Sequence, residues 1–296
     1  MAQKPTVPVV KKASEPKLSE ALLSNGCDPS IEELESIAQR LRRNIVKMTF
    51  TAGSGHPGGS LSEIDILTVL YFKVMRINPK APLWDARDRF ILSKAHACPG
   101  LYAVLAARGY FEEEELWTFR KVNSRLQGHA HIMTPGVEMS SGSLGQGLSF
   151  GIGCALAARI DGSQYHTYVM LGDGECDEGQ VWEAAMAASH YGLDNLTAIV
   201  DRNRIQNDRP TDQVMNLEPF VNKWRAFGWK VFEIDGHDTS EILSSLNQIS
   251  EVKGQPAVII AHTVKGKGVS FMENNPAFHG ASPNKDQLEK AIRELS

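Results

Sequence analysis

Apolar and polar positions along the chain follow two periodicities, one typical of helices and one of buried strands. After Ser30 the apolar residues recur at helical spacing, and Glu33 stands where a capping box requires an acidic partner for Ser30. The stripe consists of Ile31, Leu34, Ile37, Ala38, Leu41, Ile45 and Met48. It stops at Gly53-Ser54-Gly55, so we expect a helix between Ser30 and this turn.

Further along, short apolar runs alternate with amphipathic segments. The runs predict strands at residues 90–92, 167–171, 196–200, 229–234 and 257–261. Helical patterns occupy residues 61–75, 100–108, 178–191 and 240–249, and a short helix ends at Leu295. The glycine-rich stretch 141–153 interrupts this pattern. Alternating strands and helices predict an α/β fold with a mostly parallel sheet and helices on both faces.

The domain organisation follows from where the pattern breaks. Residues 1–29 contain four prolines and four lysines, which predicts an extended or disordered arm, or a segment that orders on a partner. No linker rich in Pro, Gly or Ser divides the rest of the chain, so we expect a single domain over residues 30–296.

Composition excludes some classes of function. The net charge of −4 argues against a general nucleic-acid-binding protein. No apolar run approaches the roughly 20 residues of a membrane helix, and the N-terminus lacks the apolar core of a secretory signal. Four cysteines without a CxxC pair are typical of reduced thiols, so we expect a cytoplasmic protein.

The segment that carries most chemistry is Gly172-Asp173-Gly174, thirty residues before Asn203. Each follows a predicted strand, and the carboxyl ends of parallel strands meet at one edge of a sheet. A carboxylate, an amide oxygen and a nearby carbonyl, for which Ile205 would serve, are hard ligands suited to Mg²⁺ or Ca²⁺. The two glycines let the backbone approach a phosphate. An Asp-Gly pair alone would be an ordinary turn.

Histidines in glycine-flanked loops add a second signal. They are His56, His96, His129 and His279. Loops on a rigid scaffold are where binding and catalytic groups concentrate, although any one loop histidine can be a plain surface residue. A zinc site at His129 and His131 is an alternative, but the pair lacks a Cys or an HExxH frame.

Together these motifs resemble transketolases in their N-terminal half. The segment from Gly172 to Asn203 looks like the diphosphate-binding signature of thiamine diphosphate enzymes, with Arg202-Asn203 in place of the paired Asn. SGHPGG, LSKAHA, QGHA and SSGSLGQG narrow the resemblance to the transketolase branch, from about residue 31 to the C-terminus. Two departures are Lys94-Ala95 for the usual Asn-Gly and Ser143 for a usual Pro.

The resemblance implies the thiamine-diphosphate-binding fold and a set of site residues. Asp173, Asn203 and the Ile205 carbonyl would hold Mg²⁺, with Ca²⁺ or Mn²⁺ as substitutes. The diphosphate would contact His96, Gly174, Glu175, Asn203 and His279. The aminopyrimidine would lie near Gly142, Ser143 and Leu144. The groups expected to take part in catalysis are His56, His129, His279 and Glu178. Glu178 matches an acidic residue at the family's subunit interface, although a plain first-turn carboxylate is nearly as good an interpretation.

The implied chemistry is transfer of a two-carbon glycolaldehyde unit from a ketose, or ketose phosphate, to an aldose acceptor. Members of the family also need a pyrimidine-binding domain and a C-terminal domain, for which this sequence has no room. We therefore expect the N-terminal subunit of a split transketolase, paired with a C-terminal subunit in an α2β2 heterotetramer. The alternatives are the α-subunit of a two-chain 2-oxoacid decarboxylase or dehydrogenase, and a non-catalytic cofactor-binding subunit.

Overall fold

A five-stranded parallel sheet forms the centre of the chain in the computed structural model, which describes residues 28–296. The strand order is β1-β2-β3-β7-β6. The strands are β1 (Arg89–Leu92), β2 (Thr167–Gly172), β3 (Leu196–Arg202), β6 (Lys230–Asp235) and β7 (Ala257–His262). The predicted α/β fold is confirmed, and the strands lie within two residues of their predicted bounds. The prediction of an N-terminal arm concerns residues that lie, up to residue 27, outside the described part.

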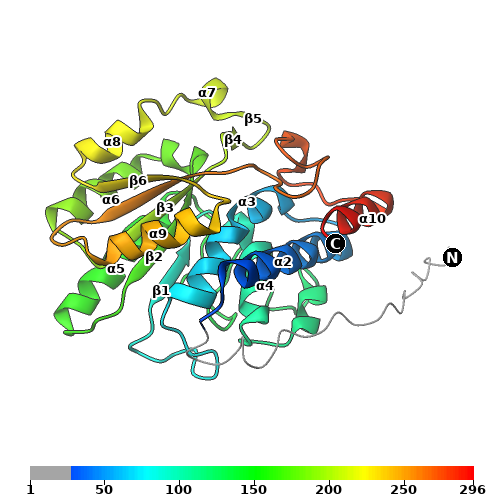
Figure 1. The fold of residues 1–296 in the computed structure, drawn as a ribbon, viewed down its shortest axis with the longest axis horizontal. Coiled ribbons are helices and arrows are strands. Elements are labelled where there is room, and N and C mark those ends of the chain that lie inside the picture. The colour runs from blue at the N-terminus through cyan, green and yellow to red at the C-terminus, as the bar shows by residue number, and fades with distance from the viewer. Residues whose placement is uncertain (1–27) are drawn as a thin grey trace.

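Helices cover both faces of this sheet (Figure 1). One layer contains α2 (Ile31–Ala52), α3 (Pro57–Val69), α4 (Cys98–Ala107), α9 (Thr239–Ser250) and α10 (Lys285–Glu294). The other layer contains α5 (Gln146–Ile160), α6 (Gly179–His190) and α8 (Phe220–Ala226). The last turn of α3 continues as a π-helical turn, Leu70–Val74. The result is a three-layer arrangement with the sheet in the middle.

The two apolar cores are separated by the sheet because successive side chains of a strand point to opposite faces. In β3, Ile199 packs with α2, α3 and α4, whereas Ala198 and Val200 pack against the layer of α5, α6 and α8. All seven residues of β3 are buried. A strand buried on both faces tends to be continuously apolar, and this explains why β3 could be predicted from sequence.

Helix α2 begins as its sequence predicts. The Ser30 hydroxyl accepts a hydrogen bond from the Glu33 amide at 3.2 Å, and the Ser30 amide donates to the Glu33 carboxylate at 2.8 Å. The helix ends at Gly53, whose φ of 64° is left-handed. Ile31 is 37% exposed, so the apolar stripe begins at Leu34, one turn later than predicted.

Helix α5 corrects the sequence interpretation, because it begins inside the glycine-rich stretch 141–153. Two of its glycines allow the helix to approach the sheet closely. A Cβ at Gly147 would lie 2.4 Å from the Ser93 side chain, and one at Gly151 would lie 2.5 Å from Val169. These glycines serve tertiary packing rather than a flexible loop.

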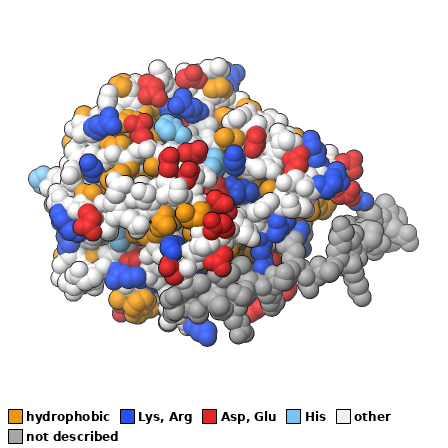
Figure 2. Space-filling model, viewed as in Figure 1, with side chains coloured by type: hydrophobic (Ala, Val, Ile, Leu, Met, Phe, Trp, Pro, Cys, Tyr) orange, Lys and Arg blue, Asp and Glu red, His pale blue; other side chains and the backbone are white. Residues whose placement is uncertain are grey.

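The remaining elements are short and lie mostly in the connections. They are the 3-10 turns Ala95–Ala97, Glu113–Thr118, Gly174–Asp177 and Pro276–Phe278, the hairpin β4 (Ile205–Gln206) and β5 (Arg209–Pro210), and α7 (Thr211–Val214). On the face seen in Figure 2, Lys and Arg side chains lie among Asp and Glu side chains. None of the helices in residues 28–296 has the length and apolar character to cross a membrane.

Candidate active site

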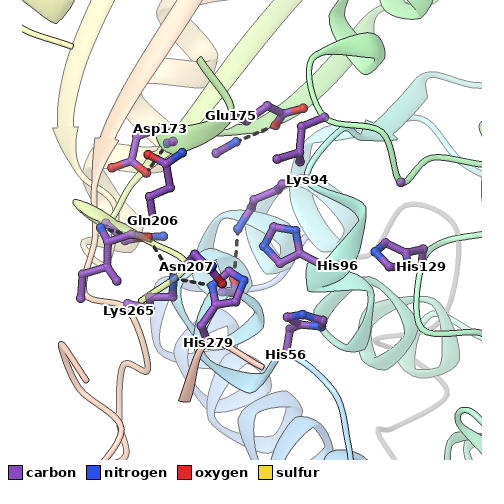
Figure 3. Close-up of a pocket in the computed structure, with 17 residues that line it drawn as sticks. His56, Lys94, His96, His129, Asp173, Glu175, Gln206, Asn207, Lys265 and His279 are labelled. Atoms are coloured by element: carbon purple, nitrogen blue, oxygen red, sulfur yellow. Dashed lines mark hydrogen bonds between the residues drawn. The ribbon is translucent and has the colours of Figure 1, made fainter. Parts of the chain in front are cut away.

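A cavity of about 340 Å³ lies at the carboxyl ends of β1, β2, β3 and β7 (Figure 3). Its wall is made of residues from loops that follow these strands, from the start of α3 and from the segment before α5. They are His56, Gly59, Lys94, His96, His129, Gly142, Leu144, Gly172, Asp173, Gly174, Glu175, Asn203, Ile205, Gln206, Asn207, Lys265 and His279. The structure thus brings together every sequence-predicted site residue except Ser143 and Glu178.

Three imidazoles form a triangle on one wall. The ring centroids of His56, His96 and His279 lie 5.1 to 5.2 Å apart, and that of His129 lies 6.4 Å from His56. His56 precedes Pro57, the first residue of α3, a position that proline favours. The Nδ1 atom of His56 is buried and has no hydrogen-bond partner within residues 28–296. A buried polar atom without a partner in a cavity indicates a place for a ligand.

His129 is held by the loop it belongs to. The Tyr102 hydroxyl donates to this loop: it lies 3.0 Å from the carbonyl oxygen of Gln127 and 3.2 Å from the carbonyl oxygen of His129. Gly142 passes beside the imidazole, since a Cβ there would lie 3.8 Å from the His129 ring. The 127–129 loop and the 142–144 segment therefore form one wall together.

The imidazoles are neutral at physiological pH. Burial, followed by the charge of Arg120, lowers the pKa of His56 to about 4. Burial, followed by the charge of Lys265, lowers the pKa of His279 to about 3. Burial also lowers the pKa of His96 and that of His129. A neutral imidazole has one donor and one acceptor nitrogen, so each ring can hold or deliver a proton.

Lys265 fixes the tautomer of His279. Its ammonium lies 2.8 Å from the Nδ1 atom of His279 and donates to the Ile205 carbonyl at 2.9 Å (Figure 3). Because an ammonium is only a donor, Nδ1 accepts and the proton of the neutral ring resides on Nε2. Burial lowers the pKa of Lys265 to about 8, so it is mostly charged at neutral pH.

The predicted metal ligands lie side by side. Asp173 accepts hydrogen bonds from the amides of Gly174 at 2.8 Å and Arg204 at 2.6 Å. The Asn203 side chain donates to Asp201 at 2.9 Å, which orients its amide, and its oxygen accepts from the Ile205 amide at 3.1 Å. The structure thus collects a carboxylate, an amide oxygen and a carbonyl, a set of hard oxygen donors that fits Mg²⁺.

The surroundings also fit a diphosphate. A Cβ at Gly174 would lie 2.7 Å from the Gln206 side chain, so glycine lets this lining side chain pack directly against the turn. Lys94 and Lys265 supply positive charge to the same cavity. Residues 28–296 contain no group of three or more His, Cys, Asp or Glu arranged to hold a metal. A zinc site at His129 and His131 therefore has no third ligand of this kind.

A buried cluster of charged side chains lies beneath the predicted metal ligands. The Lys94 ammonium lies 2.6 Å from Asp201 and 2.8 Å from Glu63, and donates to the Gly59 carbonyl at 3.0 Å. The Ser62 hydroxyl donates to Asp201 at 2.6 Å. Burial, partly offset by Lys94, raises the pKa of Glu63 to about 8. Because Asp201 also orients Asn203, the cluster links the helix layer to the predicted metal ligands.

Two predicted residues lie off the cavity wall. Ser143 is exposed, between Gly142 and Leu144. Glu178 is exposed and occupies the N-cap position of α6 without a side-chain capping bond. Its Cβ packs beside Gly145, where an added Cβ would lie 2.8 Å away.

The sequence interpretation missed four of the lining side chains: Lys94, Gln206, Asn207 and Lys265. Lys94 precedes the loop histidine His96, and Lys265 opens a Lys-Gly-Lys-Gly run directly after a strand. Their position after strands was the available signal, since ligands bind at these ends in parallel α/β sheets.

The fold and the cavity define a class of protein: a parallel α/β protein whose strand ends suit an anionic ligand together with a hard divalent cation. The family model described as "Transketolase, thiamine diphosphate binding domain" matches residues 34–296. The chain belongs to the transketolase family, in its thiamine-diphosphate-binding part.

Individual relatives agree with this assignment. The chain is 44% identical over 266 residues to an apulose-4-phosphate transketolase subunit of Phocaeicola vulgatus, covering 90% of this chain and 95% of that protein. It is 44% identical over 264 residues to a 6-deoxy-6-sulfo-D-fructose transketolase subunit of a Clostridium species, covering 89% and 96%. The crystal structure of Campylobacter jejuni transketolase superposes with a TM-score of 0.86 at 34% identity. That match covers 90% of this chain and 43% of the solved chain.

Proposed function

We propose that this chain is the diphosphate- and metal-binding subunit of a two-chain transketolase. It would transfer a two-carbon glycolaldehyde unit from a ketose or ketose phosphate to an aldose or aldose phosphate, with thiamine diphosphate and Mg²⁺. The observation that carries the proposal is one cavity in which hard oxygen donors, a glycine turn, two buried lysines and neutral histidines meet.

Each part of the cavity has a proposed role. Asp173, Asn203 and the Ile205 carbonyl would hold Mg²⁺, and His96, Gly174 and His279 would contact the diphosphate. When bound, thiamine diphosphate supplies the electron sink for cleaving the bond beside the ketose carbonyl.

The histidines would manage the protons of the sugar hydroxyls. His56, His129 and His279 line the open part of the cavity, and their neutral rings can both donate and accept at neutral pH. In His279 the Nε2 proton faces away from Lys265, so this atom is the donor that a substrate oxygen would meet.

We further propose that the chain pairs with a C-terminal subunit that carries the pyrimidine-binding half, in an α2β2 assembly. The names of the two bacterial relatives, which contain the word "subunit", and the 43% share of the solved transketolase chain support this. The segment from Gly142 to Leu144 and Glu178 would face that partner and the aminopyrimidine.

The test is an assay of the full chain mixed with its C-terminal subunit, thiamine diphosphate and Mg²⁺. We expect a ketose phosphate donor and an aldose phosphate acceptor to give a product two carbons longer, measured by mass spectrometry. Asp173→Asn should lose the activity, whereas Glu251→Gln, an exposed acid, should keep it. Decarboxylation of a 2-oxoacid without glycolaldehyde transfer would favour the 2-oxoacid enzyme, and cofactor binding without any turnover would favour a non-catalytic subunit.

A further inference from the structure

Glu175 is a buried carboxylate whose two oxygens are both occupied by the protein. One oxygen accepts hydrogen bonds from the Ser93 hydroxyl and from the Gly145 amide at 2.8 Å. The other oxygen accepts from the Gly172 amide at 2.9 Å (Figure 3). The side chain is 3% exposed although it borders the cavity.

The three donors belong to three separate segments of the wall. Ser93 follows β1, Gly145 ends the segment that contains Gly142 and Leu144, and Gly172 ends β2. The Ser93 hydroxyl also accepts from the Gly147 amide at 3.1 Å, in the first turn of α5. One carboxylate therefore joins β1, β2 and the segment that leads into α5.

The chemistry of the group argues against direct contact with a diphosphate. An ionised carboxylate only accepts hydrogen bonds and carries the same sign of charge as a diphosphate. As a direct contact Glu175 would weaken cofactor binding, and replacing it by a neutral residue would strengthen binding. Its three hydrogen bonds indicate a different role.

We propose that Glu175 is a positioning residue that sets the 142–145 segment and the Gly172–Gly174 turn at the distance that thiamine diphosphate requires. This inference rests on the proposed function. Two of the three donors, from Ser93 and Gly145, lie on the side of the 142–145 segment, which we assign to the aminopyrimidine end of the cofactor. Loss of the carboxylate should therefore disturb that end more than the diphosphate end.

The test compares variants of the full chain paired with its C-terminal subunit. Glu175→Gln keeps the shape, but its NH2 group cannot accept the hydrogen bonds that the second oxygen accepted. Ser93→Ala removes one donor and leaves the carboxylate in place. Glu251→Gln is the matched control, because it makes the same substitution at an exposed glutamate that does not line the cavity. Dissociation constants for thiamine diphosphate and for inorganic diphosphate, each with Mg²⁺, are measured by calorimetry.

We expect Glu175→Gln to raise the dissociation constant of thiamine diphosphate at least about tenfold, the scale of a lost hydrogen bond to a charged group. That of inorganic diphosphate should rise less, and amide exchange at Gly145 should become faster. Ser93→Ala should raise both dissociation constants, but by less than Glu175→Gln does. Glu251→Gln should leave both dissociation constants within about twofold of the wild-type values. Unchanged or tighter binding, or an equal rise for both ligands, would overturn the inference. If the unmodified pair bound no thiamine diphosphate, the proposed function itself would fail.

Discussion

The buried cluster around Lys94 makes a quantitative prediction about stability. Lys94 is the cation that contacts both Glu63 and Asp201, and all three side chains are at most 3% exposed. Lys94→Met removes the charge and keeps most of the apolar stem, so packing changes little. The variant leaves two buried acidic groups without their cation.

The size of the effect follows from the geometry. Breaking a buried ion pair by removing one partner costs about 3–5 kcal/mol, because the remaining charge has no compensation. Glu63 can reduce this cost by staying protonated, since its pKa is already raised to about 8. Asp201 stays buried as a charged group, because it is held in place by hydrogen bonds such as the one from Ser62. At about 2 °C for each kcal/mol in a chain of this size, the melting temperature should fall by roughly 6–10 °C.

The assay is urea unfolding at pH 7, followed by tryptophan fluorescence, because Trp224 and Trp229 are buried in the core beside α8. The control is Lys253→Met, which removes an exposed lysine and should change stability by less than about 0.5 kcal/mol. A loss below about 1 kcal/mol for Lys94→Met would refute the reasoning that this cluster depends on its cation.

Three further predictions concern pH and the metal. Because burial raises the pKa of Glu63 from 4.5 to about 8, its contribution to stability is complete below about pH 4.5 and is lost as the pH rises through about 8. The urea midpoint of Glu63→Gln should therefore be close to that of the wild type at about pH 5 and higher than that of the wild type at about pH 9. The same difference in midpoint at both pH values would contradict this. The low pKa values of His56 and His279 predict a kcat/KM–pH profile without a step near 6.5; a step that His56→Asn removed would disprove it. Asp173→Asn should raise the dissociation constant of thiamine diphosphate at least about tenfold with Mg²⁺ and little with EDTA, by calorimetry; equal affinity of variant and wild type with Mg²⁺ would count against the metal site.

The strands and most helices could be predicted because their signals are local. Strands β1, β2, β3 and β7 are apolar runs that are almost entirely buried, whereas β6 is mostly exposed or half-buried. The start of α2 is indicated by the capping box at Ser30. Helix α5 could not be predicted, because its glycines are explained only by contacts with Ser93 and Val169, which come from other segments. The prediction that Ile31 belongs to the buried stripe was wrong for a similar reason, because the periodicity of a helix does not show where the layer that covers it ends.

The residues of the candidate site also differ in whether local sequence could predict them. Asp173 and Asn203 could be placed because each follows a strand, and parallel strands bring their ends together. Lys94 and Lys265 also follow strands, but their burial could not be predicted, because in sequence a buried lysine looks like any surface lysine. Their burial depends on partners such as Asp201 and His279 that are distant in the chain. The hydrogen bonds of Glu175 could not be predicted from sequence either, because their donors come from three separate segments.

The pairing of His56 with His279 has a consequence for how the protein is made. These rings lie 5.2 Å apart, yet one precedes every strand of the sheet and the other follows the last. During synthesis the sheet can form completely while one wall of the cavity is still missing, because contacts between distant segments are made late. A chain that ended before His279 would contain the residues of all five strands and lack this part of the cavity wall. The contacts that a ligand makes with both His56 and His279 thus become possible only after every strand of the sheet has been synthesised.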